Sequence, residues 1–351
     1  MQLTARDLNR TLLARQHLLE RTTSAVSPMV QHLIGLQAQA NLPPYLSLAA
    51  RIDGFDPEHV STGLIDKSLV RLLTMRGTVH LLVAEDALSL RQWTQPRQDR
   101  ERASSQSVKE ATHLDTATFN DAVSGLLATG PLSGKELGLR LAEVFRDAPP
   151  TALTNLARVN LPLAQLPPRG CWRRAGGVVY QYVDRWLGRP LVDPDVPARV
   201  RRYLRAFGPA TAADMTAWSG VTRLGPVIAG MDDLVEHADP TGRRLYDVAD
   251  APIVAGHHPA PVRLLGQYDN LWLSHAARDR VTTGENRQRW MGLNGGAAHT
   301  VFVDGMLEGL WRVVDDALEF ELFRDLTRAE QGELDAETAR VERLVGIAGR
   351  S

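Results

Sequence analysis

Two copies of one short pattern decide how this chain is organised: Gly130-Pro131-Leu132-Ser133-Gly134-Lys135-Glu136-Leu137 and, 78 residues later, Gly208-Pro209-Ala210-Thr211-Ala212-Ala213-Asp214-Met215. Both copies read Gly-Pro-apolar, then Ser or Thr, then an acidic residue three positions on. This spacing resembles a capping box, in which the two side chains bond backbone N–H groups at the start of a helix. Each copy therefore predicts that a helix begins shortly after its Gly-Pro pair.

The segments around both copies follow the same order. Each copy comes after an amphipathic helix and is followed by a second helix, a third helix and two short strands. Around the first copy we expect helices at 116–128 and Thr151–Gln165, and strands within Cys171–Tyr182 around Gly176-Gly177. Around the second copy we expect helices at 196–207 and Leu224–Val235, and strands at 235–237 and 244–248. Three helices followed by a β-hairpin form the winged-helix pattern, and the repeat indicates tandem modules.

The N-terminal part fits the same template without the Gly-Pro pair. We expect helices at Thr4–Leu19, from Ser27-Pro28 onward and at Pro57–Lys67, followed by strands at Leu69–Met75 and Thr78–Val83. The last hundred residues differ. They contain a strand-like run at Arg263–Leu273, a strong hairpin signal at Asp304-Gly305, a strand at Leu318–Leu322 and an acidic helix at 327–345.

The prediction is therefore an α+β fold, with three tandem winged-helix modules and a C-terminal β-rich region that contains a β-hairpin. The predicted divisions are 1–110, 111–192, 193–250 and 251–351. An unrelated series of α+β modules is the alternative, because the pattern by itself does not specify how the segments pack.

Composition excludes several classes of protein. Of the 351 residues, 44% are hydrophobic and 23% are charged, which is ordinary for a folded chain and argues against disorder or a fibrous repeat. No stretch approaches the roughly 20 apolar residues that a membrane helix needs, and the first residues carry no apolar signal-peptide core. The one cysteine, Cys171, excludes an internal disulfide framework. We expect a cytoplasmic, nucleoid-associated monomer that does not bind membranes.

Charge is unevenly distributed along the chain. Residues 301–351 hold 6 Arg and 12 acidic residues, a charge of −6, so the other 300 residues carry +5. The basic residues are 37 Arg and 3 Lys. Arginine suits phosphate recognition, although a GC-rich genome also produces this bias. The mild basic excess is compatible with a polyanionic partner.

Motifs for nucleotide and metal chemistry are missing from the sequence. It has no Walker phosphate loop, dinucleotide-binding glycine fingerprint or Gly-x-Ser-x-Gly elbow. His257-His258 lies in a Pro-rich loop without a nearby pair of partner ligands. We therefore expect neither a cofactor nor a metal.

The most informative polar stretch is Leu36-Gln37-Ala38-Gln39-Ala40-Asn41-Leu42-Pro43-Pro44. Pro43 restricts Leu42 to extended conformations, so we expect the helix begun at Pro28 to end near Ala40 or Asn41. Residues two apart lie about 200° apart on a helix, so Gln37 and Gln39 face one cleft only where the helix unwinds. The alternative is two polar residues at a frayed helix end.

A second stretch, Arg76-Gly77-Thr78-Val79-His80-Leu81, forms the tip and return strand of the first predicted wing. Arg, Thr and His side chains at a wing tip are suited to phosphate contacts. A single His on a strand is otherwise usually structural.

Four signatures in one order carry a resemblance to a known family. They are Gln37-Ala38-Gln39, Arg76-Gly77-Thr78-Val79-His80-Leu81, Asn294-Gly295-Gly296, and Phe302-Val303-Asp304-Gly305 with Gly309-Leu310-Trp311-Arg312. Together they resemble the winged-helix DNA glycosylase family typified by AlkZ, in its Gln-x-Gln subgroup. The resemblance spans nearly the whole chain. It implies excision of N7-alkylated purines, including bulky or crosslinked adducts, from double-stranded DNA in bacterial self-resistance to a genotoxic natural product.

The resemblance also implies the site residues. Gln37 and Gln39 would be catalytic, and a hairpin near Asp304-Gly305 would probe DNA at the lesion, with Met306 and Leu307 as an apolar wedge. An ordinary sheet corner that packs against the C-terminal helix is the alternative for that hairpin. The expected DNA-binding residues are Arg76, Thr78, His80, Asn294, Met306, Leu307 and Arg312.

The implied chemistry fits two glutamines. An N7-alkylguanine is cationic, so its glycosidic bond is already weakened and the leaving base needs little protonation. A glutamine amide accepts and donates hydrogen bonds but is no useful base near neutrality. Gln37 and Gln39 are therefore expected to hold a water and the sugar by preorganised dipoles, in a monofunctional hydrolase. The alternatives are a non-catalytic winged-helix transcriptional regulator and a scaffold that has lost DNA affinity.

Overall fold

A computed structural model describes residues 1–292 and 298–346. The chain divides into two compact units. Unit 1 comprises Met1–Pro57, Pro197–Trp218 and Arg223–Ser351, and unit 2 comprises Glu58–Val196 and Ser219–Thr222. Each unit contains helices and small antiparallel sheets, so the predicted α+β class is confirmed. Within the described ranges, no helix is long and apolar enough to span a membrane.

Unit 1 contains the N-terminal helices and the C-terminal sheet. Its N-terminal elements are α1 (Ala5–Arg15), α2 (Val26–His32), β1 (Leu36–Gln37) and α3 (Leu42–Ala49). Its central elements are α11 (Val196–Phe207, which begins at the unit boundary), α12 (Ala212–Ser219), α13 (Leu224–Ala229), β7 (Leu234–Ala238) and β8 (Arg244–Val248). Its last elements are β9 (Arg263–Leu265), α14 (Asn270–Leu273), α15 (Gly284–Met291), β10 (His299–Val303), β11 (Met306–Val314), β12 (Ala317–Leu322) and α16 (Arg328–Val345).

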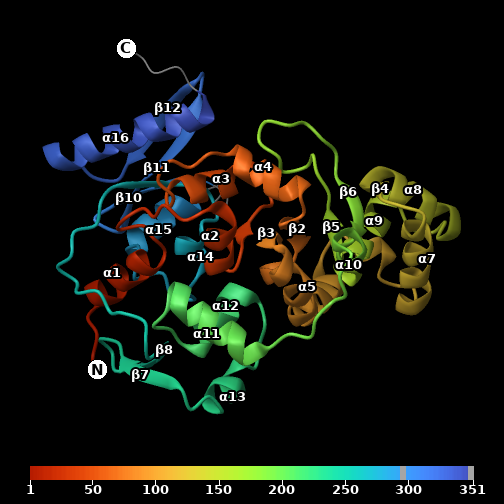
Figure 1. Ribbon diagram of the computed structural model, residues 1–351, viewed down its shortest axis with the longest axis horizontal. Coiled ribbons are helices and arrows are strands. Elements are labelled where there is room, and N and C mark those ends of the chain that lie inside the picture. Colours follow the sequence, from red (N-terminus) through yellow and green to blue (C-terminus); the bar gives the residue numbers. More distant parts are fainter. Residues whose placement is uncertain (293–297, 347–351) are drawn as a thin grey trace. The chain divides into compact units, whose positions relative to one another are not determined.

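Unit 2 contains the segment around the first Gly-Pro copy. It begins with α4 (Glu58–Ile65), β2 (Leu69–Leu73), the 3-10 turn η1 (Met75–Gly77), β3 (Val79–Val83), α5 (Ala84–Trp93) and α6 (Gln95–Ser104). It continues with the short turn η2 (Lys109–Ala111), α7 (Thr116–Ala128), β4 (Leu132–Ser133), α8 (Gly134–Val144), α9 (Pro150–Asn160), β5 (Leu163–Gln165), β6 (Val179–Tyr182) and α10 (Val183–Leu187). Five of its strands are adjacent in the order β3-β2-β5-β6-β4, and α7, α8 and α9 gather beside β4 (Figure 1).

The two Gly-Pro copies form the predicted helix starts. The Ser133 hydroxyl accepts a hydrogen bond from the Glu136 N–H at 3.1 Å, and α8 follows. Thr211 and Asp214 bond each other's backbone N–H groups at 3.1 and 2.9 Å, and α12 follows. The helices before both copies have the predicted bounds, 116–128 and 196–207. The element order agrees with the predicted winged helices, and the four-part division of the chain remains a prediction.

Three element predictions were too long or misplaced. The helix predicted to reach Gln165 ends at Asn160, because Pro162 follows and Leu163–Gln165 pairs as β5 with β6. The helix predicted at Leu224–Val235 ends at Ala229, and residues from Leu234 join β7. Within Cys171–Tyr182 only Val179–Tyr182 is a strand. Apolar residues at these ends satisfy either a helix or a strand, and pairing partners decide between them.

The C-terminal sheet was predicted closely. Its strand order is β12-β11-β10-β9, and Val303 pairs with Met306 across a two-residue turn. Asp304 and Gly305 both have positive φ, 48° and 75°, as a type I′ turn requires. The run predicted as a strand from Arg263 to Leu273 is a strand only as far as Leu265, and its end forms α14.

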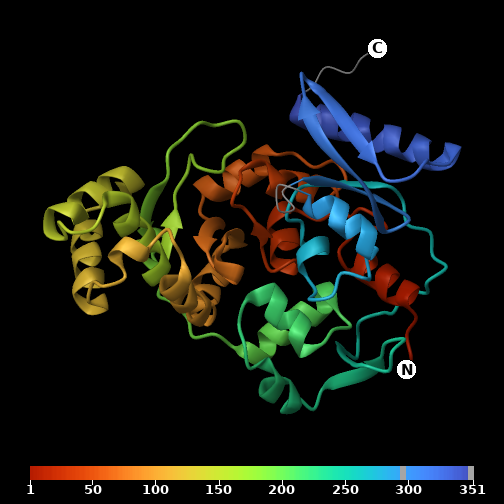
Figure 2. The ribbon, with the colours of Figure 1, turned by 180° about the vertical axis from the view of Figure 1, so that it is seen from behind.

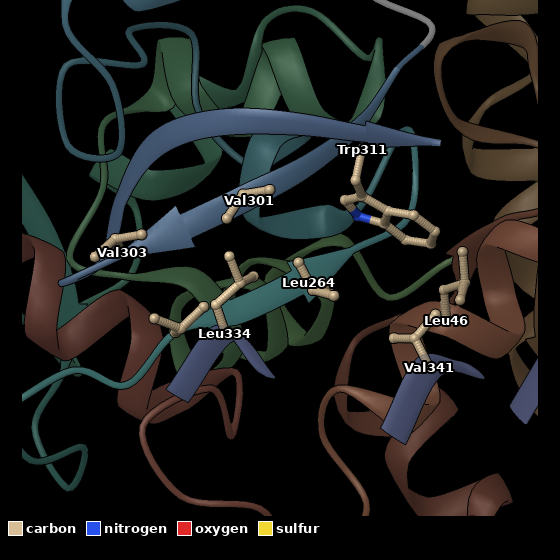
Figure 3. Close-up of a cluster of buried hydrophobic side chains, with 8 residues drawn as sticks. Leu46, Leu264, Val301, Val303, Trp311, Leu334 and Val341 are labelled. Carbon is tan, nitrogen blue, oxygen red and sulfur yellow. The ribbon is translucent and has the colours of Figure 1, made fainter. Parts of the chain in front are cut away.

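A buried apolar cluster joins this sheet to the N-terminal helices. Leu264, Val301, Val303 and Trp311 project from β9, β10 and β11, and Leu334 and Val341 meet them from α16 (Figure 3). Both ribbon views show α16 lying along this sheet (Figures 1 and 2). Leu46 of α3 belongs to the same cluster and is 1% exposed. Burial of one such side chain stabilises the fold by about 1.5–3 kcal/mol, so α3 is anchored on the C-terminal sheet.

Beside the cluster, a buried ion pair joins the chain just after α3 to the residue that caps α14. The Arg51 guanidinium donates to both carboxylate oxygens of Asp269 at 2.7 and 2.8 Å, and both side chains are at most 1% exposed. Arg51 also donates to the Ser47 hydroxyl at 2.9 Å and to the Gln16 amide oxygen at 2.8 Å. Burial alone would raise the pKa of Asp269, but the Arg51 charge and the bonds from Arg51 and Ser47 lower it below its ordinary value. The carboxylate therefore stays ionised and links three segments.

We expect Asp269→Asn to destabilise unit 1 by about 3–5 kcal/mol, because it leaves the Arg51 charge buried without its counterion. Urea unfolding followed by tryptophan fluorescence measures the loss. The matched control is Asp250→Asn, which removes an exposed partner of Arg205 (2.7 Å) and should change stability little. Equal, small effects of the two substitutions would contradict this account of the buried pair.

Candidate active site

The Gln-x-Gln segment lies between two helices of unit 1 and is not the end of one. Helix α2 ends at His32, eight residues earlier than predicted. Pro43 and Pro44, which we expected to terminate a helix, lie in the first turn of α3. The N–H groups in a first helical turn need no partner inside the helix, so proline is tolerated there. The predicted end near Ala40 was therefore wrong, whereas a non-helical Gln pair was correct.

A strained turn separates α2 from the glutamines. Ile34 has φ 52° and Gly35 has φ 92°. A positive φ is rare for a β-branched residue and costs about 1–3 kcal/mol, so the surroundings must enforce it. Ile34 is fully buried, which supplies part of that enforcement. The turn brings the chain directly into β1, where Gln37 lies.

The two glutamines differ in exposure. Gln37 ends β1 and is 8% exposed, whereas Gln39, in the bend before α3, is exposed. Both residues take part in interactions within the protein. Two positions later, Asn41 is half-buried; its carboxamide oxygen is buried and accepts no hydrogen bond from any residue that the structure describes. Such an unsatisfied acceptor is costly and is typical of sites that meet a water or ligand.

Sequence reasoning missed the residues that support this segment. Asn270, the first residue of α14, donates from its amide to the carbonyl oxygens of Gly35 (2.9 Å) and Leu33 (3.3 Å). Asp269 caps the same helix and accepts the Leu271 N–H at 2.9 Å. An Asp followed by a short apolar run is a helix-start signal, but it does not show which distant segment the side chains will meet.

In unit 2, the structure brings Arg76, Thr78 and His80 together at the turn between β2 and β3. Arg76, at φ 55°, donates from Nη2 to His80 Nε2 at 3.0 Å, and His80 Nδ1 donates to the Thr78 carbonyl at 3.0 Å. His80 is fully buried, and burial together with the Arg76 charge lowers the pKa of His80 well below 6.5. His80 is therefore a neutral ring that holds Arg76, and it is not placed to contact a phosphate itself.

Helix α6 closes over the same turn. Gln98 donates to the Thr74 carbonyl at 2.6 Å. A Cβ on Gly77 would lie 3.2 Å from the Arg97 guanidinium, and one on Gly220 would lie 3.2 Å from the Arg76 backbone nitrogen. Gly77 and Gly220 thus permit close packing that keeps the Arg76 turn in one conformation, with Arg76 and Thr78 half-buried.

The Asp304-Gly305 turn is a packed corner in this structure. Arg10 donates to the Asp304 carbonyl at 2.9 Å, Arg6 pairs with its carboxylate at 3.0 Å, and Asn9 donates to the Gly305 carbonyl at 2.8 Å. Met306 is half-buried and Leu307 is fully buried. These contacts favour the predicted alternative of a packed corner, with α1 and not the C-terminal helix packing on the turn. The apolar wedge of Met306 and Leu307 stays a prediction.

The remaining predicted residues have separate positions. Arg312 is exposed on β11 and forms a forked ion pair with Glu319 of β12 at 2.7 and 3.0 Å. Asn294 lies outside the described residues. The exposed turn of this sheet is Asp315-Asp316, between β11 and β12, where both residues have positive φ. In the described ranges, no group of three or more His, Cys, Asp or Glu side chains could hold a metal ion.

Comparison with known proteins gives the class of this protein. The family model described as "DNA glycosylase AlkZ-like" matches residues 30–344. The chain therefore belongs to the AlkZ-like DNA glycosylase family, and the resemblance drawn from the sequence is confirmed.

A sequence match and a structural match illustrate the similarity. The chain is 29% identical, over 358 residues, to the interstrand DNA cross-link repair glycosylase of Streptomyces sahachiroi, with 95% of this chain and 94% of that protein covered. It is also similar to the solved structure of the S. sahachiroi DNA glycosylase AlkZ, with a TM-score of 0.80 at 26% identity, covering 99% and 98% of the two chains.

We expect Leu307→Ala to lower the free energy of unfolding by about 2–5 kcal/mol, because it leaves a cavity at a fully buried position. Met306→Ala should cost less, since Met306 is half-buried. Val313→Ala, at a 43% exposed position on the same strand, is the control, with a change of about 0.5 kcal/mol or less. Thermal and urea unfolding measure all three. Unchanged stability together with weaker binding of damaged DNA would instead identify Leu307 as a wedge.

Proposed function

We propose that this protein is a monofunctional DNA glycosylase that hydrolyses the N-glycosidic bond of N7-alkylated purines. The observation that carries the proposal is the buried, strained and braced segment that presents Gln37 and Gln39. Strain held in place by several surrounding contacts is a common property of functional sites. Membership of the AlkZ-like family supports DNA as the substrate. It disfavours the non-catalytic regulator and scaffold alternatives.

The proposed chemistry needs no strong base. The N7-alkylated purine carries a positive charge, so C1′–N9 cleavage leaves the bond's electron pair on the base and neutralises it. A water oxygen then bonds C1′ of the oxocarbenium-like sugar, and its proton passes to solvent. The exposed Gln39 positions this water, and the buried Gln37 supports the sugar and the segment by fixed amide dipoles. Such a site favours lesions that are already activated, because it lacks a carboxylate to drive the departure of a neutral base.

DNA binding is proposed to rest on phosphate contacts. Arg76 and Thr78 are half-buried at a turn whose conformation is fixed, and the exposed Arg312 is a weaker candidate because Glu319 already pairs with it. Among the described residues of the C-terminal sheet, Asp315 and Asp316 form an exposed turn, so this hairpin is better placed to approach DNA than the turn covered by α1. Its two carboxylates repel phosphates, so it would have to enter a groove.

The biological role is part of the same proposal. The S. sahachiroi relative is named for repair of interstrand DNA cross-links. We propose that the substrates here include bulky or crosslinked N7 adducts, and that the enzyme protects a producing bacterium from its own DNA-alkylating natural product.

We expect Gln39→Ala to slow base release about a hundredfold or more, and Gln37→Ala to slow it as well, because each removes a preorganised dipole from the site. The assay measures the purine released from a duplex with one N7-alkylguanine under single-turnover conditions. Gln31→Ala, an exposed glutamine on α2, is the control and should retain full activity. DNA affinity should be little changed. Full activity in the double Gln37→Ala/Gln39→Ala variant would exclude the pair from the mechanism.

We expect affinity for undamaged duplex DNA to fall steeply with salt and to depend little on base sequence, because phosphate contacts release bound counterions. Fluorescence anisotropy over a range of salt concentrations measures the slope, and Arg76→Ala should reduce it by about one phosphate contact. Strong preference for one palindromic operator, or affinity that does not vary with salt, would favour the regulator or the scaffold.

A further inference from the structure

A side chain from a distant part of the sequence bonds the turn before the Gln-x-Gln segment. Ile34 and Gly35, both at positive φ, turn the chain from α2 into β1. The carbonyl groups on either side of Ile34, those of Leu33 and Gly35, converge on one point. Two converging carbonyl oxygens repel each other unless a donor lies between them.

Asn270 supplies that donor. Its Nδ2 lies 2.9 Å from the Gly35 oxygen and 3.3 Å from the Leu33 oxygen, and the residue is 2% exposed. Water therefore does not replace this amide while the protein is folded. The two hydrogens of one NH₂ group are donated to two carbonyl oxygens. The bonds therefore give both oxygens a donor and also limit the distance between them.

Asn270 is itself firmly placed. It is the first residue of α14, and its neighbour Asp269 caps that helix and forms the buried ion pair with Arg51. Arg51 follows α3, the helix that begins directly after the glutamines. Asp269 and Asn270 therefore hold the chain on both sides of Gln37 and Gln39.

We propose that Asn270 is a positioning residue for the Gln-x-Gln segment: by clamping the Leu33 and Gly35 carbonyls it sets the direction in which β1 presents Gln37 and Gln39. The inference rests on the proposed function for its catalytic consequence. Asn270 itself contacts neither water nor substrate in this account. Its effect is on the rate of the chemical step and not on the affinity for DNA.

The test uses two substitutions and a closely matched control. Asn270→Ala removes the donor, and Asn270→Asp keeps the shape but turns an oxygen toward two carbonyl oxygens. The control is Asn9, which is also buried and also donates from Nδ2 to two carbonyls, those of Arg280 (2.6 Å) and Gly305 (2.8 Å), at the packed corner. Asn9→Ala and Asn9→Asp likewise remove two amide-to-carbonyl bonds at a position that the mechanism does not use; Asn9→Ala also removes the Oδ1 acceptor of Arg10, which Asn9→Asp keeps.

Two measurements are made on the full chain. The first is single-turnover base release from the N7-alkylguanine duplex, together with the Kd for that duplex. We expect the Asn270 variants to release base about a hundredfold more slowly, with Kd little changed, because a small misplacement of reacting groups has an effect of that size. The Asp variant should be at least as slow as the Ala variant. The Asn9 variants should lose comparable thermal stability and keep the wild-type rate.

The second measurement is amide hydrogen exchange of residues 33–39, which needs no substrate. We expect exchange there to accelerate about tenfold or more in the Asn270 variants and to stay at the wild-type rate in the Asn9 variants. Only the Asn270 variants remove hydrogen bonds to the Leu33 and Gly35 carbonyls. The inference would be overturned if residues 33–39 exchanged at the wild-type rate in both Asn270 variants. It would also be overturned if the Asn9 variants lost as much of the base-release rate as the Asn270 variants. If the wild-type protein releases no base, the proposed function fails, and the exchange result still decides whether Asn270 holds the turn.

Discussion

The buried ion pair between Arg51 and Asp269 is the interaction on which the candidate site depends. A charge removed from water is stable only beside a well-placed counterion, so the pair strictly limits how α3 and α14 can lie. Ser47 and Gln16 also accept hydrogen bonds from Arg51, and Gln16 brings the end of α1 into the same arrangement. The Gln-x-Gln segment, which leads into α3, is thereby attached to the C-terminal part of unit 1.

This construction suits chemistry performed by neutral amides. An amide dipole stabilises a developing charge only if it already points in the correct direction, because reorientation during the reaction would consume the benefit. A strained turn clamped by Asn270, a Leu46 anchor in the apolar cluster and the Arg51–Asp269 pair all restrict the same short segment. Together they hold rigid the segment that carries Gln37 and Gln39, whose neutral amides act only when they are correctly oriented.

The abundance of arginine has a partly structural explanation. Arg10, Arg51 and Arg91 are almost completely buried, and each donates to carbonyl groups or to a side chain from another segment. Others, such as Arg201, pair with acids at the surface. The basic excess of the first 300 residues therefore does not indicate which arginines contact DNA. The few arginines at tightly packed turns, such as Arg76, are better candidates for phosphate contacts.

Local sequence determined the features that need only neighbouring residues. The Ser133 cap and the Thr211–Asp214 capping box set the starts of α8 and α12. Asp304-Gly305 set a two-residue turn, and four ordered signatures identified the family. Tertiary structure decided the rest. Pro43-Pro44 can end one helix or begin another, and the packing of Leu46 on the C-terminal sheet selected the second. Asn270 lies more than 230 residues from the carbonyls it bonds. The packing of the Asp304-Gly305 turn likewise depends on Asn9 and Arg10 of α1, because only the folded chain brings such distant groups into contact.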